Sequence, residues 1–149
     1  MRKARLTISV LLLTILLSGC SFLGEVNNTL QYANQATDYI DKTQRFADEI
    51  PQLAQNAVNN VEARQDLEAE LQAMKAEIQK FNGVEVPDMA SDIHNQIESY
   101  NQKLEEGINI YLKNIKDGVF DPAVLENSGI MTTVNEITNL LNQIEKLGG

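Results

Sequence analysis

The sequence predicts an all-α protein, an antiparallel bundle of four longer helices with one or two short helices between them. Apolar residues recur at steps of three and four along most of the chain, the spacing that places them on one face of a helix. β-branched residues do not alternate with polar ones, and proline occurs only at positions 51, 87 and 122. Helices joined by short connections bury such faces by packing antiparallel against one another.

The first nineteen residues differ in character from this bundle. Basic residues at positions 2, 3 and 5 precede an uncharged apolar run from Leu6 to Leu17. This run is too short to cross a bilayer comfortably, and its layout is that of a secretory signal peptide. The ending Leu17-Ser18-Gly19-Cys20 resembles the lipobox of bacterial lipoprotein precursors. The resemblance implies that signal peptidase recognises Leu17, Ser18 and Gly19 and cuts before Cys20, whose thiol carries a diacylglyceryl group.

Two other interpretations of this segment fit the residues less well. An ordinary secretory signal with a chance cysteine needs small residues such as Ala-x-Ala at the cut, and only Ser18-Gly19 followed by Cys20 approaches that pattern. An uncleaved anchor needs roughly 20 apolar residues, whereas Ser18, Ser21 and Glu25 end the run early. We therefore expect a signal peptide at 1–19, the lipidated cysteine and a short tether at 20–25, and a single domain at 26–149.

Lipidation would supply a membrane affinity that the charge of the chain opposes. Removal of the signal takes the basic count from 12 to 9 against 21 acidic residues, so the mature chain has a net charge of −12. Anionic headgroups repel such a chain, whereas two acyl chains hold a protein stably at a bilayer. Cys20 is the only cysteine, so once lipidated it leaves no thiol for a disulfide or a metal. Phe22 and Leu23 either dip into the lipid interface or cover the base of the helical core.

The first part of the domain predicts a long helix followed by a short one. Apolar residues over about 26–48 form a wide helical face, in which Tyr32 and Tyr39 lie one heptad apart. Pro51 fits the first turn of a helix and disrupts a helix interior, so we expect a break there and a second, short helix after it. The sequence leaves open whether that helix continues into the next, although Asn60 is a suitable N-cap for a new one.

The two clearest helical patterns follow. Residues 62–82 carry apolar side chains at alternating four- and three-residue steps, and Gly83 is a helix stop signal. After an extended linker, Asp88 is expected to cap the longest helix, 89–116. Gly107 stands in the apolar stripe of that helix where a large residue is usual, which indicates close approach of a neighbouring segment.

The remaining residues predict a short helix and a longer one. Asp121 and Pro122 are the residue types typical of an N-cap and a first helical position, and they predict one short helical turn that ends near Asn127. Gly129 separates it from a last helix over about 130–147. Phe120 is expected to tuck back onto the core.

The sequence contains no recognisable catalytic motif. His94 is the only histidine; the Glu-x-x-His spacing of di-iron bundles fails because position 91 is Ser, and we expect His94 on the polar surface of its helix. No Gly-x-Ser-x-Gly and no glycine-rich phosphate loop is present. The sequence favours a protein that is not an enzyme, with no metal site and no cofactor apart from the covalent lipid on Cys20. Four carboxylates are typical of solvated helix faces and do not form an acid/base pair: Glu68, Glu70, Glu105 and Glu106.

Charge and tyrosine content limit the partners. A net charge of −12 with few basic residues argues against binding to nucleic acid. Tyr32, Tyr39, Tyr100 and Tyr111 are candidates for lining a ligand pocket between helices. A pair such as Tyr32 and Tyr39 more often belongs to the core with its hydroxyls at the rim, and we favour that interpretation for these two residues.

Several short stretches spread over the chain share one resemblance. They are Leu17 to Leu23, Glu25 to Asn28, Ile93-His94, Ser99 to Asn101, Asn114-Ile115 with Gly118 and Asp121-Pro122, and Asn135 to Thr138. They look like a family of short, uncharacterised membrane lipoproteins of Gram-positive, Bacillus-type bacteria. The resemblance implies attachment at the outer face of the cell membrane, and it carries over no activity, ligand or catalytic residue.

Two functions from different classes are consistent with these features. The first is a non-catalytic interaction module, a lipid-anchored bundle on the extracytoplasmic face of the cell membrane that binds an envelope or membrane protein through acidic, amide-rich faces. The second is a small-ligand or divalent-cation binding lipoprotein that uses the interhelical space or acidic clusters. A surface spacer without a ligand is a third. We favour the first, and the sequence specifies neither the partner nor the oligomeric state.

Overall fold

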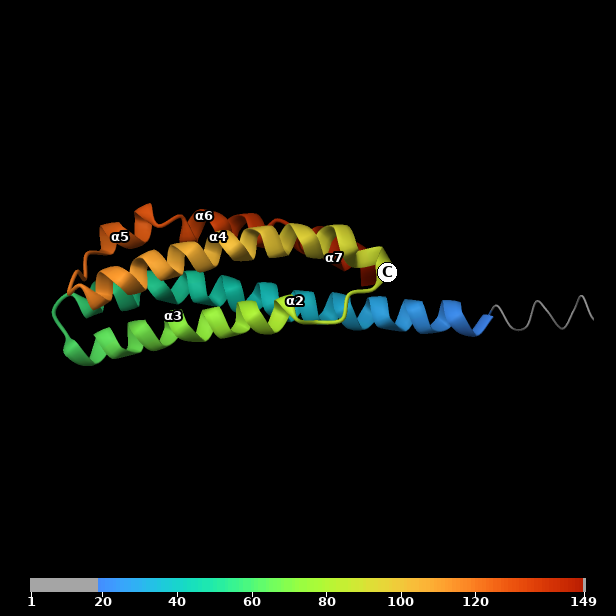
Figure 1. Ribbon diagram of the computed structural model, residues 1–149, viewed down its shortest axis with the longest axis horizontal. Coiled ribbons are helices and arrows are strands. Elements are labelled where there is room, and N and C mark those ends of the chain that lie inside the picture. The colour runs from blue at the N-terminus through green and yellow to red at the C-terminus, as the bar shows by residue number, and fades with distance from the viewer. Residues whose placement is uncertain (1–18, 149) are drawn as a thin grey trace, which may run out of the picture.

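The computed structural model describes residues 19–148, with side chains from residue 26 onward, and every regular element within that range is a helix. Figure 1 shows these helices running along one long axis. They are α2 (Gly19–Ala57), α3 (Val61–Asn82), the 3₁₀ turn η1 (Asp88–Ala90), α4 (Ser91–Lys116), α5 (Pro122–Asn127), α6 (Ile130–Thr138) and α7 (Leu141–Gly148).

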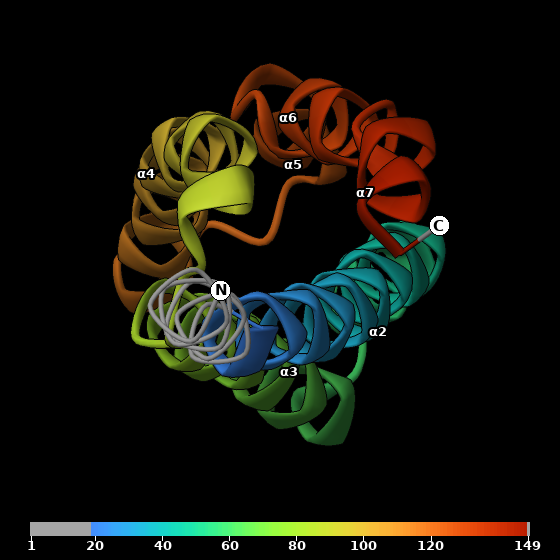
Figure 2. The same ribbon diagram turned by 90° about the vertical axis from the view of Figure 1, so that its right-hand side faces the viewer.

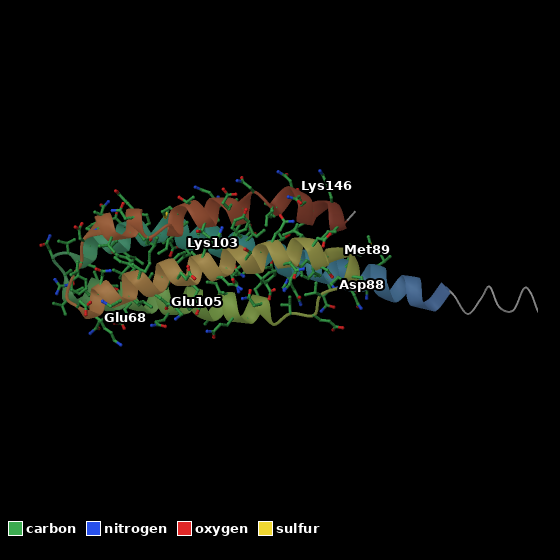
Figure 3. All side chains as sticks on the ribbon, turned by 45° about the horizontal axis from the view of Figure 1, so that its top comes forward. Glu68, Asp88, Met89, Lys103, Glu105 and Lys146 are labelled. Carbon is green, nitrogen blue, oxygen red and sulfur yellow. The ribbon has the colours of Figure 1, made fainter. Side chains whose placement is uncertain are left out.

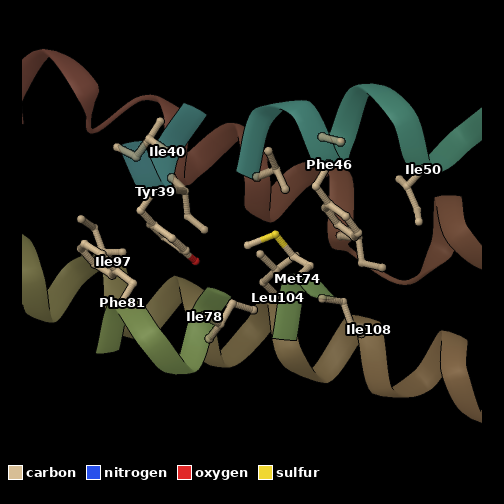
Figure 4. Close-up of a cluster of buried hydrophobic side chains, with 14 of the residues drawn as sticks. Tyr39, Ile40, Phe46, Ile50, Met74, Ile78, Phe81, Ile97, Leu104 and Ile108 are labelled. Atoms are coloured by element: carbon tan, nitrogen blue, oxygen red, sulfur yellow. The ribbon is translucent and has the colours of Figure 1, made fainter. Parts of the chain in front are cut away.

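The helices form an antiparallel bundle with four corners, which confirms the predicted fold class. Seen down the long axis, α2 lies between α3 and α7, and α4 lies between α3 and α6 (Figure 2). Helices α2 and α4 therefore run parallel to each other on one diagonal, and the fourth corner is shared by the short helices at the end of the chain. Side chains from three corners meet in the middle, where Phe46, Met74 and Leu104 pack together (Figure 4).

Helix α2 continues through Pro51, so the predicted break at this residue is wrong. Proline in a helix interior removes one backbone hydrogen bond and costs about 3 kcal/mol. The flanking residues Phe46, Ile50 and Ala54 are each at most 2% exposed. They keep the three- and four-residue spacing that the helix has before Pro51, so burial of one continuous stripe offsets the local cost.

Helix α2 also begins earlier than expected, at Gly19. The segment 20–25, expected as a tether, is helical, and Thr29 is the first buried residue among those with described side chains. Figure 1 shows the first turns of α2 projecting beyond the other helices. We call residues 19–28 the stem, and we call the end of the bundle from which it leaves the near end. The side chains of Phe22 and Leu23 lie outside the part that the structure describes.

The turn between α2 and α3 confirms that these are separate helices, with Asn60 as the N-cap. The Asn60 side-chain oxygen accepts from the backbone N–H groups of Glu62 at 2.8 Å and Ala63 at 3.3 Å. Arg64 donates to the carbonyl of Ala57 at 2.8 Å, one of the orphan acceptors at the end of α2. Its guanidinium carbon lies 4.1 Å from the ring centre of Phe120, which tucks back as expected.

The start of α4 differs from the prediction. Asp88 does not cap the helix: it opens the 3₁₀ turn η1, and α4 begins after Ala90 without a side-chain cap. The reason is local, because the backbone carbonyl of Pro87 accepts the N–H of Ala90 at 2.9 Å and thereby closes that turn. Further along, the predicted close approach at Gly107 is confirmed, since an added Cβ would lie 2.7 Å from the carbonyl oxygen of Ser128.

The carboxyl-terminal helix is interrupted where one continuous helix was predicted. Asp121 caps α5 as expected, accepting from the N–H of Ala123 at 2.9 Å. The last segment then divides into α6 and α7 around Asn139 and Leu140. The Thr138 hydroxyl donates to the carbonyl of Val134 at 2.9 Å, a contact that bends helices. At this interruption Leu140 is buried, while Leu141, four residues after Ile137, is only partly buried.

Candidate functional site

The near half of the bundle contains two polar contacts that cross the core between α2 and α4. Tyr32 and Tyr39 lie seven residues apart on α2, and His94 and Asn101 lie seven residues apart on α4. All four side chains are at most 5% exposed. Because the two helices run parallel on a diagonal, the same spacing on both brings each tyrosine to one polar partner. We call these contacts the polar layers.

The first polar layer joins Tyr32 to His94. The Tyr32 hydroxyl lies 3.2 Å from Nδ1 of His94, and the other ring nitrogen, Nε2, lies 3.6 Å from a carboxylate oxygen of Glu98. The expected surface position of His94 is therefore wrong. The 4–3 spacing of Leu104, Ile108, Tyr111 and Ile115 extends back along α4 to Asn101, Ile97, His94 and Ala90. His94 thus belongs to the stripe that faces the centre of the bundle.

The second polar layer joins Tyr39 to Asn101. The Tyr39 hydroxyl donates to the side-chain oxygen of Asn101, and the Asn101 amide donates to the side-chain oxygen of Asn82 at 2.6 Å. The ring of Phe81 stacks on Tyr39 with 4.3 Å between centroids and also lies 5.3 Å from the His94 ring. The polar layers are therefore hydrogen-bonded and separated by aromatic packing.

Both polar layers are uncharged at neutral pH. Burial raises the pKa of the Tyr32 and Tyr39 phenols, and the nearby Glu98 carboxylate adds to this effect at Tyr32. Burial lowers the pKa of His94, and Glu98 offsets only part of that shift. With its proton on Nε2, the nitrogen that faces Glu98, neutral His94 would accept from the Tyr32 hydroxyl at Nδ1. This arrangement fixes the register of α2 against α4.

The four candidate tyrosines do not share one pocket. Tyr32 and Tyr39 are core residues, as favoured from the sequence, but their hydroxyls reach His94 and Asn101 across the core and do not lie at its rim. Tyr100 is only partly buried, and its hydroxyl lies 3.5 Å from a carboxylate oxygen of Glu136. Tyr111 is fully buried, and its hydroxyl has no hydrogen-bond partner among the described residues. The structure brings together only the first two.

Tyr32 and Tyr39 nevertheless contribute to a surface groove beside the polar layers. One hollow of about 230 Å³ includes Tyr39 and Phe81 in its wall. A second of about 240 Å³ includes Tyr32, and both hollows share Gln35 and Val84. We call the two together the α2–α3 groove. Its other lining residues are Asn28, Gln31, Asp38, Lys42, Glu77, Lys80, Glu85, Val86 and Pro87.

Sequence reasoning missed the partners of the tyrosines. His94 was expected on the polar surface and Asn101 was assigned no position, although their seven-residue spacing matches that of Tyr32 and Tyr39. Asn82, the last residue of α3, had no signal in the sequence beyond its position before a helix stop. The matching heptads were the one pattern from which the pairing could have been found.

The remaining sequence-derived site residues lie at the start of the chain. Leu17 and Ser18 precede the described residues, while Gly19 and Cys20 form the first backbone positions of α2. Among the side chains that the structure describes within residues 19–148, no group of three from His, Cys, Asp or Glu is placed to hold a metal ion. No helix in that same range has the length and apolar character needed to span a bilayer.

The comparisons with known proteins agree with the resemblance at the start of the chain. Residues 32–147 match a family of unknown function, DUF6376. The chain belongs to this family. It is also 38% identical, over 130 residues, to the uncharacterized lipoprotein YybP of Bacillus subtilis (strain 168), a match that covers 87% of this chain and 88% of that protein. No solved structure matches the chain. The matched region of the family contains both polar layers, and the relative's description as a lipoprotein agrees with the lipobox.

Proposed function

We propose that this protein is a lipid-anchored, non-catalytic interaction module on the extracytoplasmic face of the cell membrane. The observation that carries the proposal is the unbroken course of α2, which begins beside Cys20 and reaches the far end of the bundle at Ala57. A continuous helix holds the other helices of the bundle, which pack on it, at fixed positions relative to the lipid anchor. The bundle is then held at a fixed height, which raises its local concentration for partners in the same membrane.

The outer surface of the bundle supports a role in binding proteins. Charged side chains of both signs are exposed on the bundle, among them Glu68, Lys103 and Lys146 (Figure 3). The −12 charge of the mature chain disfavours direct adhesion to anionic lipid. A partner that meets this surface is therefore an envelope or membrane protein, reached through the anchor.

In-cell cross-linking with an amine-reactive reagent tests this function. We expect discrete adducts between the native lipoprotein and another envelope or membrane protein, and we expect these adducts to disappear in the Cys20→Ala variant, which lacks the anchor. If the two strains formed the same adducts, the anchor would have no role in bringing the protein to its partner. The absence of any adduct with a second protein would contradict the interaction module itself.

A small-ligand binding lipoprotein is the second candidate, because Tyr32 and Tyr39 line the α2–α3 groove. Binding of a ligand at 100 times its Kd adds about 2.7 kcal/mol to the free energy of unfolding. Thermal unfolding in the presence of envelope-derived small molecules and of divalent cations therefore tests this alternative. If no compound raises the melting temperature, the small-ligand function is excluded. If a compound raises it and Gln35→Ala abolishes the rise, the ligand binds in the groove.

A further inference from the structure

The α2–α3 groove has the length of a short extended peptide. It runs along α2 from Asn28 to Lys42, which corresponds to about 21 Å at 1.5 Å per residue. About six residues of extended chain, at 3.3–3.4 Å each, cover the same distance. The end of α3 and the linker at 84–87 form the opposite wall.

The lining side chains suit a polypeptide backbone. Asn28, Gln31 and Gln35 form a row of amides along one face of α2, with spacings of about 5–6 Å between neighbours. Amides both donate and accept hydrogen bonds, as backbone N–H and C=O groups require. An extended chain presents such groups toward one side about every 6.7 Å, twice the rise per residue. The spacing of the amides is therefore close to the repeat of a bound backbone. A single small molecule has no such repeat.

Two other classes of occupant fit less well. A docked amphipathic helix needs apolar anchor sites, yet the large exposed apolar residues of the described chain, such as Val61, Met89 and Ile110, lie elsewhere. A glycan would stack on an open aromatic face, but Tyr32, Tyr39 and Phe81 are at most 3% exposed. The aromatic residues support the groove from beneath and present little ring surface to it.

The groove contains charged side chains of both signs that can pair with side chains of a partner. Lys42 donates to Glu77 at 2.7 Å across the groove, and this contact lowers the pKa of the Glu77 carboxyl, so the pair is charged at neutral pH. Asp38 and Lys80 line the groove without an ion pair among the described residues. They are available to an incoming side chain of opposite charge.

The stem places this groove close to the membrane. Asn28 lies about 12 Å and Lys42 about 33 Å along the helix axis from Cys20. We propose that the α2–α3 groove binds an extended segment of an integral membrane protein, located just outside the bilayer. This inference rests on the proposed function, since it names the partner class and the binding surface of the interaction module.

Site-specific photo-cross-linking of the full-length lipoprotein in cells tests the groove. The photo-reactive residue p-benzoyl-phenylalanine replaces Gln31 or Gln35, and the matched control replaces Asn34. All three residues are exposed on the same turns of α2, but Asn34 lines neither hollow. We expect positions 31 and 35 to cross-link to one segment of a single integral membrane protein, mapped by peptide mass spectrometry to residues beside a membrane span. We expect loss of that adduct at position 34.

Several outcomes would overturn the inference. They are an adduct with a second copy of this chain, an adduct with a secreted protein, equal yields at positions 34 and 35, and no adduct at positions 31 and 35. If position 34 alone cross-links to a membrane protein, the interaction module stands and the groove is not its binding surface. If the amine-reactive reagent also finds no second protein, the proposed function fails together with the groove.

Discussion

The polar layers show how single residues select one arrangement of the bundle. A core made only of Leu and Ile tolerates shifts of one helix along another, because apolar contacts are not directional. The Tyr39 hydroxyl and the Asn101 amide are satisfied in one register only, and a buried polar group that loses its partner costs about 1–3 kcal/mol. Tyr32 and His94 impose the same register one heptad nearer the stem.

Buried His94 gives the protein a predictable response to acid. Its folded-state pKa lies below the ordinary value of 6.5, so below about pH 6.5 the unfolded chain binds a proton that the native protein does not. Stability therefore falls as the pH drops from 7 toward 5.5, by at most about 1.4 kcal/mol per pH unit. Urea unfolding at several pH values measures this slope.

The control for this prediction is the His94→Gln variant, which has no titrating group at this position. His94 is the only histidine in the chain, so we expect the slope above pH 5.5 to be smaller in the variant, whatever its absolute stability. Equal slopes in the two proteins would show that His94 does not titrate differently on folding.

Gly107 shows a different effect of a single residue, a close approach that admits no side chain. In Gly107→Ala, the new Cβ would lie 2.7 Å from the backbone carbonyl oxygen of Ser128 and 2.9 Å from the side chain of Ile130. We expect a net loss of about 1–3 kcal/mol by urea unfolding, since overpacking outweighs the gain of about 1 kcal/mol in helix propensity. The control is Gly83→Ala, where the nearest atom is 3.6 Å away. A Gly107→Ala protein as stable as the native one would contradict the close approach.

At the scale of helices, the sequence predicted several features that depend on local hydrogen bonds and missed one, because Asp88 opens η1 where it was expected to cap α4. The caps at Asn60 and Asp121 and the stop at Gly83 each involve neighbouring residues, and all three are confirmed. The break after α6 goes with the local hydrogen bond from Thr138 to the carbonyl of Val134, whereas the continuity of α2 through Pro51 depends on packing against other helices. His94 was misplaced for the same reason, because the width of the buried face of α4 is set by its two neighbours.

The unbroken α2 leads to a prediction for Pro51. Pro51→Ala restores a backbone donor in the helix interior, and proline there is about 3 kcal/mol less favourable than alanine, so we expect the free energy of unfolding to rise by about 1–3 kcal/mol. Pro122→Ala is the matched control, because Pro122 stands at the first positions of α5, where its missing N–H has no intrahelical acceptor. If Pro51→Ala is destabilising, α2 does not continue through this residue as described.

At the scale of the whole molecule, the stem and the bundle form one rod with the predicted lipidation site at its start. The α2–α3 groove lies on the first half of that rod, and the turn between α2 and α3 lies at its far end. The apolar spacing predicted the bundle, whereas the anchor that the lipobox implies stays a prediction. The groove could not be predicted, because it depends on the path of the linker at 84–87 beside α2.

The central claim is that lipid on Cys20 holds this bundle at the membrane, and intact-protein mass spectrometry of the membrane fraction tests it most directly. The native protein is predicted to lack residues 1–19 and to carry the added mass of a diacylglyceryl group. The Cys20→Ala variant is predicted to lack that added mass. If the unprocessed mass of all 149 residues is found in both strains, the first residues are not a lipoprotein signal, and the account of an anchored bundle is contradicted.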